Sequence, residues 1–83
     1  MNTRRQNEKK FGKWENLPDG GRRYWYDVKG HRGQSARYIK EVDSEEKTIR
    51  FYQEIYDNHG KLIEIHLKYP KDEGHIEIKD SRL

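Results

Sequence analysis

Hydrophobic and polar residues alternate in two runs between residues 47 and 70, KTIRFYQEIYDNHGKLIEIHLKYP. Alternation with a period of two is the pattern of a half-buried β-strand. The two runs are joined by DNHG, in which Gly60 can take the left-handed conformation that closes a three-residue turn with a bulge. The pattern predicts a β-hairpin around which the rest of the chain is organised.

Pairing Asp57 with Lys61 across this turn predicts which side chains of the hairpin share a face. The core face would carry four pairs: Ile55 with Ile63, Gln53 with Ile65, Phe51 with Leu67, and Ile49 with Tyr69. The outer face would carry Tyr56 with Leu62, Glu54 with Glu64, Tyr52 with His66, and Arg50 with Lys68. Two of the outer pairs have like charge, so a neighbouring strand is expected to supply opposite charges.

Residues 36–42 also alternate, and a short polar loop over residues 43–47 joins them to the hairpin. A hairpin connection of this length predicts six cross-strand pairs: Val42 with Ile49, Glu41 with Arg50, Lys40 with Phe51, Ile39 with Tyr52, Tyr38 with Gln53, and Arg37 with Glu54. Two of these pairs join opposite charges. The agreement supports a three-stranded meander, although Lys40 and Gln53 on the inner face predict a core that is thin or open at one edge.

Two further strands are predicted at residues 22–29 and 75–79. In the first, the alternation leaves open whether Tyr24 and Tyr26 or Arg23 and Trp25 are buried. The fold prediction is all-β: an antiparallel meander of four to five strands over residues 14–80, as an open sheet or partial barrel. Residues 1–13 are polar and basic and predict a flexible arm, and residues 81–83 a tail. The alternative is an α+β arrangement with a short N-terminal helix packed on the sheet.

The composition describes a small domain with little apolar material. Leu, Ile, Val and Phe make up 15 of the 83 residues, while the net charge is only +3, which favours a folded but marginal domain over disorder. The chain has no cysteine, which excludes disulfides and thiolate sites. It has no apolar run of membrane length, so a soluble, cytoplasmic protein without membrane contact is expected.

Charge is unevenly distributed along the chain. Residues 1–40 carry net +7 and residues 41–83 carry net −4. Such asymmetry is typical of an anion-binding surface, or of two halves that neutralise each other. Basic and aromatic residues interleaved on one sheet face favour a platform for RNA or single-stranded DNA. The residues predicted to form it are Arg23, Arg37, Arg50, Tyr52, His66 and Lys68.

Two other functions fit the same residues. A metal-independent ribonuclease needs a base for the 2′-hydroxyl, an acid for the leaving oxygen and cations for the phosphorane-like charge. On the outer face, these roles would fall to His66, Glu64, Glu54, Tyr52 and Arg50. A protein partner or a homodimer could instead use the acidic loop, residues 43–46, or an edge strand. The histidines lack metal-ligand spacing, so no metal and no cofactor are predicted.

The runs GGRRYWYDVKGHRGQSARYIKEVD and FYQEIYDNHGKLIEIHLKYPKDEGH resemble a group of small bacterial proteins of unassigned function. Related versions of that group close larger, toxin-like chains. The resemblance covers about residues 20–75 and assigns no site residue, but it adds weight to the nuclease alternative. The preferred prediction is a non-enzymatic binding module, with nucleic acid as the first ligand and protein as the second.

Overall fold

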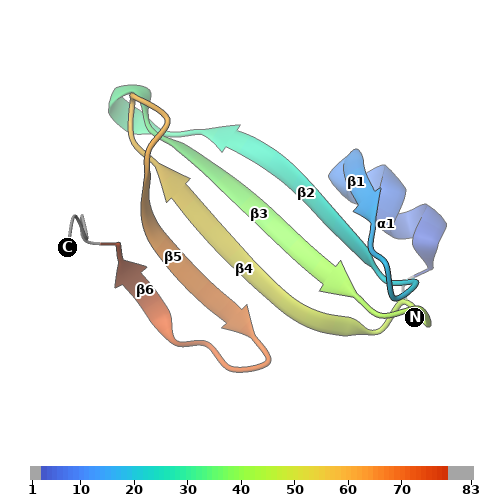
Figure 1. Cartoon of the computed structure of the whole chain (residues 1–83). Coiled ribbons are helices and arrows are strands. Elements are labelled where there is room, and N and C mark those ends of the chain that lie inside the picture. Colours follow the sequence, from blue (N-terminus) through green and yellow to red (C-terminus); the bar gives the residue numbers. More distant parts are fainter. Residues whose placement is uncertain (1–2, 79–83) are drawn as a thin grey trace.

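A computed structural model describes residues 3–78 of the chain. They form one short helix and six strands in a single open sheet (Figure 1). The elements are α1 (Arg4–Phe11), β1 (Lys13–Asn16), β2 (Arg22–Lys29), a 3-10 turn (His31–Gly33), β3 (Ser35–Val42), β4 (Thr48–Tyr56), β5 (Leu62–Tyr69) and β6 (Gly74–Glu77).

Each strand is antiparallel to the one before it, and the strand order follows the sequence from β1 to β6. The antiparallel meander is therefore confirmed, but it has six strands and not four to five. The additional strand is β1, which pairs with β2. With α1 at its β1–β2 end (Figure 1), the molecule fits the α+β alternative. Among the described residues, no helix has the length and apolar character needed to cross a bilayer.

The helix α1 occupies most of the segment predicted as a flexible arm. Thr3 and Gln6 form a capping box, in which each side chain satisfies a backbone N–H of the other. Gly12, with a left-handed φ of 82°, ends the helix. Phe11 is buried against Tyr24, with ring centroids 5.7 Å apart. Packing of this single aromatic residue overrides the polar composition that predicted flexibility.

The core is small and lies between α1 and the sheet. Phe11, Tyr24 and Val42 are buried there, and Tyr26 and Phe51 pack against them. The Tyr24 side of β2 is therefore the covered one, which settles the question left open by the alternation. We call this side of the sheet the helix-side face. The opposite side, which no helix of the described residues covers, is the open face.

A buried polar network holds α1 onto the sheet. The carboxylate of Glu46, in the β3–β4 loop, accepts hydrogen bonds from Arg4 (2.7 Å), from Asn7 (2.9 Å) and from the Tyr24 hydroxyl. The amide oxygen of Asn7 accepts from Lys40 Nζ at 3.1 Å. Burial opposes ionisation of Glu46, but these hydrogen bonds outweigh it and hold the pKa of the carboxyl below its usual value.

The predicted register of β3 and β4 is confirmed at five of its six pairs, from Arg37 with Glu54 to Glu41 with Arg50. The sixth pair is wrong. Val42 lies opposite Thr48, because an irregularity after Glu41 leaves Ile49 as an extra residue. Ile49 is 42% exposed, so the bulge places it outside the core.

The predicted register of β4 and β5 is wrong beyond the turn. Tyr56 lies opposite Leu62 as predicted, but two bulges then leave Ile63 and Lys68 as extra residues. The remaining pairs are Ile55 with Glu64, Glu54 with Ile65, Gln53 with His66, Tyr52 with Leu67, and Phe51 with Tyr69. A bulge shifts the alternation by one residue. Each side chain of residues 64–67 therefore lies on the face opposite to the predicted one. The shift separates both like-charge pairs of the predicted register, which is a physical reason for it.

Candidate functional site

The structure divides the residues predicted to form a site between the two faces of the sheet. The open face carries Arg23, Arg37, Arg50, Tyr52 and Glu54. The helix-side face carries Glu64, His66 and Lys68. The predicted nucleic-acid platform is thus assembled only for its three arginines and Tyr52, while His66 and Lys68 lie behind the sheet.

The same division takes apart the predicted ribonuclease constellation. Tyr52 lies opposite Leu67 and donates its hydroxyl hydrogen bond to Glu41 (3.2 Å), whereas His66 bonds Asp72 on the other face (2.7 Å). Burial and the nearby Glu41 carboxylate raise the pKa of Tyr52 to about 12. The structure therefore separates His66 and Glu64 from the other predicted members, Tyr52, Glu54 and Arg50, which stay together on the open face.

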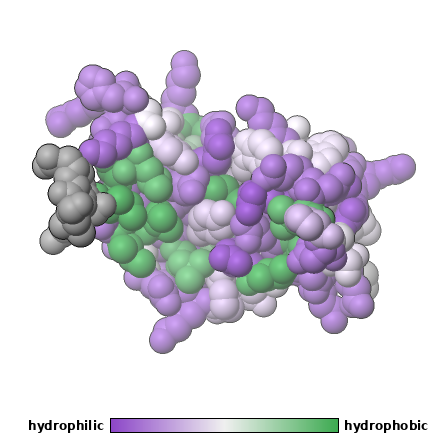
Figure 2. Space-filling view, in the orientation of Figure 1, coloured by the Kyte–Doolittle hydropathy of each residue, from purple (hydrophilic) through white to green (hydrophobic). Residues whose placement is uncertain are grey.

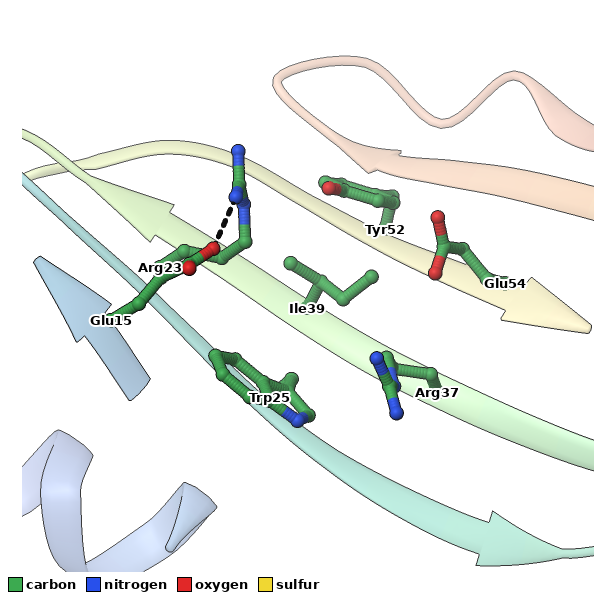
Figure 3. Close-up of a pocket in the computed structure, with 7 residues that line it drawn as sticks. All are labelled: Glu15, Arg23, Trp25, Arg37, Ile39, Tyr52 and Glu54. Atoms are coloured by element: carbon green, nitrogen blue, oxygen red, sulfur yellow. Dashed lines mark hydrogen bonds and ion pairs between the residues drawn. The ribbon is translucent and has the colours of Figure 1, made fainter. Parts of the chain in front are cut away.

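The open face holds a shallow hollow of about 420 Å³ (Figure 3). Its lining combines Trp25, Ile39 and Tyr52 with charged side chains from β1 to β4: Glu15, Arg23, Arg37 and Glu54. Figure 3 shows Arg23 reaching across to Glu15, with Nη1 2.5 Å from Oε2. Of the predicted platform residues, Arg23, Arg37 and Tyr52 line this hollow and Arg50 does not.

All three arginines of the open face are already paired with carboxylates. Glu41 accepts a hydrogen bond from Arg23 (2.9 Å) and forms an ion pair with Arg50 (2.8 Å). Arg37 donates two hydrogen bonds to Asp27, at 2.7 and 3.2 Å, and holds the pKa of that carboxyl below its usual value. Since planar, bidentate pairing uses the donors that would grip a phosphate, the hollow offers little free positive charge.

The helix-side face has a larger groove of about 620 Å³ along the flank of α1. Lysines and aromatic residues make up nearly all of its lining, which is Lys10, Phe11, Lys40, Lys47, Thr48, Phe51 and Tyr69. No carboxylate is among these residues. We call this the lysine groove.

A row of aromatic rings crosses three strands of the helix-side face, and its two end members, Phe11 and Phe51, line the lysine groove. The centroids of Phe11 and Tyr26 are 5.5 Å apart, those of Tyr26 and Tyr38 are 5.0 Å apart, and those of Tyr38 and Phe51 are 6.4 Å apart. The last two pairs are stacked. The Nζ atom of Lys68 lies over this row, 5.2 Å from the Tyr38 ring centroid and 5.9 Å from that of Phe51. Such spacing is that of cation–π contacts.

The lysines in and beside the groove have few carboxylate partners. Within residues 3–78, Lys10 and Lys40 of the lining, and Lys68 beside it, have no carboxylate oxygen within 4.0 Å, although the buried Lys40 donates to the amide oxygen of Asn7 (3.1 Å). Lys47 has one, Glu45 at 3.7 Å, but both side chains are about three-quarters exposed and such pairs are weak. Burial and the neighbouring Lys10 lower the pKa of Lys40, so an anion placed here would relieve an unfavourable charge.

Two histidines touch on the helix-side face where β5 pairs with β6. His66 and His75 lie opposite each other, with ring centroids 4.3 Å apart. Each has its own carboxylate: Asp72 for His66 (2.7 Å) and Glu64 for His75 (3.0 Å). The bulge at Ile63 places both His66 and Glu64 on this face, so the contact between the two rings and the contact of His75 with Glu64 depend on it. The sequence pattern did not predict this bulge. In the described part of the chain, no three His, Asp or Glu side chains are placed to hold a metal ion.

The lysine groove was missed because the prediction assigned the binding role to the other face. The sequence did contain an indication of the groove. Lys40 was predicted to lie opposite Phe51 on the core face, and a lysine is a poor partner for an aromatic ring in a core. That pair was interpreted as a thin core. A cation beside an aromatic ring on a half-buried face is equally the pattern of a ligand groove.

Comparison with known proteins adds no relative: no family model, no curated protein and no solved structure matches the chain. The resemblance to small bacterial proteins that close toxin-like chains stays a prediction. The function proposed below therefore depends on the geometry of the two faces.

Proposed function

We propose that the protein is a non-enzymatic binding module for single-stranded nucleic acid and that the lysine groove is its binding surface. One observation carries the proposal: lysines that make no strong ion pair within the described part of the chain lie beside aromatic rings, in a groove whose lining holds no carboxylate. Basic side chains that follow the phosphates, together with rings on which bases stack, are the elements of sequence-tolerant single-strand recognition.

The chemistry of each part fits this ligand. Tyr69 is 47% exposed at the mouth of the groove and offers a ring face to a base. Lys10 and Lys47 are exposed at the rim and meet phosphates without first breaking a strong ion pair. Lys68 lies over the rings of Tyr38 and Phe51, so a base that stacks there moves the ammonium group outward to the backbone phosphate.

The open face is the weaker candidate for the same ligand. Its arginines donate to Glu15, Asp27 and Glu41, and a phosphate would have to replace these carboxylates. The ribonuclease alternative is weaker too, because its predicted imidazole, His66, lies on the other face from Tyr52, Glu54 and Arg50. Protein binding through the acidic loop loses part of its basis, since Glu46 of that loop is turned inward toward α1.

The proposal is tested by fluorescence anisotropy with a mixed-sequence single-stranded RNA of about 10 nucleotides, a length within the site sizes of known single-strand modules. Replacing Lys10 and Lys68 by Gln is expected to weaken binding roughly tenfold and to lower the salt dependence by about two phosphate contacts. The control replaces Lys29 and Lys61 by Gln. These lysines lie at the opposite end of the sheet, so the net charge changes equally and we expect binding within about twofold of wild type.

Three results would count against the proposal. Equal losses in the two double variants would mean that only net charge attracts the RNA. Absence of binding at about 50 mM salt, where phosphate contacts are strongest, would remove nucleic acid as the ligand. Cleavage of the RNA during the titration would overturn the non-enzymatic assignment and restore the ribonuclease alternative.

A further inference from the structure

The strand β6 is an edge of the sheet whose outward main-chain groups have a definite order. The N–H of Ile78 donates to the carbonyl of Ile63 at 2.7 Å, so the peptide groups of Ile76 and Ile78 face β5. Because peptide groups alternate along a strand, those of His75 and Glu77 point away from the sheet. Within residues 3–78, no strand lies beyond β6. Its outward N–H and C=O groups form a template for one more strand.

The side chains of this edge leave apolar surface in water. Ile76 is 46% exposed and Ile78 is 39% exposed, and Ile76 lies beside Ile65 of β5. Figure 2 shows apolar surface at this end of the molecule, at the left of the view. An edge strand with exposed isoleucines and free main-chain donors invites pairing with another strand.

The charges on the other side of β6 are unbalanced. Glu77 lies directly opposite Glu64, and Glu64 is already bonded to His75 at 3.0 Å. Among the described residues, Glu77 has no cation within 4.0 Å. A carboxylate beside a like charge is unfavourable and is stabilised by any basic group placed next to it.

We propose that β6 pairs with β6 of a second copy of the chain, antiparallel about a two-fold axis at Ile76. In this register Ile76 faces Ile76 of the second copy, and His75 faces Glu77 of the second copy on each side of the axis. Each outward N–H of His75 and Glu77 then meets an outward carbonyl. The dimer would be a continuous sheet of twelve strands, twice the six of one copy.

The charges on β6 favour this register over the two adjacent ones, in which the two-fold axis lies at Glu77 or at His75. An axis at Glu77 would place Glu77 against itself, and an axis at His75 would place Glu77 against Glu73. Both pair like charges across the strands. The axis at Ile76 instead gives every Glu77 a histidine neighbour and stacks the isoleucines. Because β6 is short, the interface is small and the dimer is expected to be weak and concentration-dependent.

The absence of cysteine from the chain allows a direct test of the register. Ile76→Cys places two thiols opposite each other at the axis, in a non-hydrogen-bonded pair where the Cα atoms approach closely. Under mild oxidation we expect covalent dimer to form about tenfold faster than with Ile49→Cys, since disulfides require this approach. Ile49 is similarly exposed (42%) but lies in β4 near the opposite end of the sheet, which makes it the matched control.

Ile78→Cys distinguishes this register from others. In the proposed dimer its two copies are offset by four residues, about 13 Å along the strands, which is beyond the reach of a disulfide. Ile78→Cys is therefore expected to cross-link no faster than Ile49→Cys. Faster cross-linking of Ile78→Cys than of Ile76→Cys would overturn the proposed register.

A second test removes only the donor that the dimer uses. Glu77→Pro deletes an outward N–H, which forms no bond to β5, so the monomer keeps its sheet. By sedimentation velocity we expect Glu77→Pro to remain monomeric at concentrations where wild type is partly dimeric, with Glu77→Gln in between. Wild type that stays monomeric at the highest soluble concentration, or Glu77→Pro that dimerises like wild type, would overturn the proposal. Neither test involves nucleic acid, so its result does not depend on the proposed function.

Discussion

On the open face every arginine forms an ion pair with a carboxylate, whereas on the helix-side face Lys10, Lys40 and Lys68 have no carboxylate within ion-pair distance among the described residues. Both faces would count as basic in a sequence. The difference lies in the geometry of the side chains. The rigid fork of arginine fits carboxylates on neighbouring strands and holds the register, whereas lysine on its flexible stem keeps its charge for another partner. The number of basic residues on a face therefore says less about ligand binding than their pairing does.

The faces also differ in what holds them together. The open face is formed by strand residues alone. The lysine groove is formed by strands together with α1, which is one of its walls. That wall depends on Glu46, which joins Arg4, Asn7 and Tyr24. The binding surface is thus the part of the molecule that is easier to break.

The largest expected effect is that of Glu46→Gln. The substitution removes a buried charge that accepts three hydrogen bonds, and we expect it to lower the free energy of unfolding by about 2 kcal/mol. Urea denaturation followed by circular dichroism measures this loss. Glu45→Gln, at an exposed neighbouring position, is the control and is expected to change stability by less than about 0.5 kcal/mol. Equal effects would show that Glu46 does not anchor α1.

Glu46 also predicts a pH dependence. Its folded-state pKa lies below the ordinary value of 4.5, so its contribution to stability is present above pH 4.5 and is lost as the pH falls through the folded-state pKa. We expect the stability difference between wild type and Glu46→Gln to shrink as the pH is lowered from 6 to 3. A difference that stays constant over this range would contradict the assignment.

A smaller effect is expected from Lys40→Met. The pKa of Lys40 is lowered below 10.5, so the folded state loses this proton before the unfolded state does, and stability attributable to Lys40 rises as the pH increases toward 10.5. We expect wild type to gain stability relative to Lys40→Met between pH 7 and 10. Lys29→Met, at an exposed position, is expected to show no such trend in thermal unfolding followed over the same range.

The smallest expected effect tests whether the carboxylates of the open face prevent its arginines from binding phosphate. Asp27→Asn removes the charge that Arg37 is bound to. We expect this to release the guanidinium for phosphate and to tighten RNA binding by about twofold. The Arg37 side-chain N–H resonance is expected to shift on addition of RNA in Asp27→Asn but not in wild type. Glu73→Gln, which removes a charge elsewhere, controls for the change in net charge.

A region of the fold could be predicted from the sequence where several independent patterns indicated the same alignment. The β3–β4 register was predictable because apolar alternation and the pairs Glu41–Arg50 and Arg37–Glu54 all indicated one alignment. The helix α1 was predicted only as the α+β alternative, because its buried residues are only Asn7 and Phe11, too few to give a helical period. Its signals were the capping box and Gly12, which are local and easily overlooked.

The β4–β5 register failed for a different reason. Ile63, Ile65 and Leu67 alternate correctly on either face, so the apolar pattern alone does not reveal a bulge. The like-charge pairs Glu54–Glu64 and Arg50–Lys68 were the available evidence against the simple register. For the candidate site, the sequence could predict the residue types, aromatic and basic. It could not predict the face on which each side chain lies, because that face depends on the bulge.

The two bulges of β5 enclose residues 64–67 and have a consequence for how this protein can change over generations. Loss of Ile63 would remove the first bulge and leave residues 64–67 opposite their present partners on β4, so every side chain would keep its face. Loss of any of residues 64–67 would instead change which side chains share a face, because alternation has a period of two. The bulge residue is therefore the position in this strand where descendants of the chain can lose a codon without exchanging the chemistry of the two surfaces.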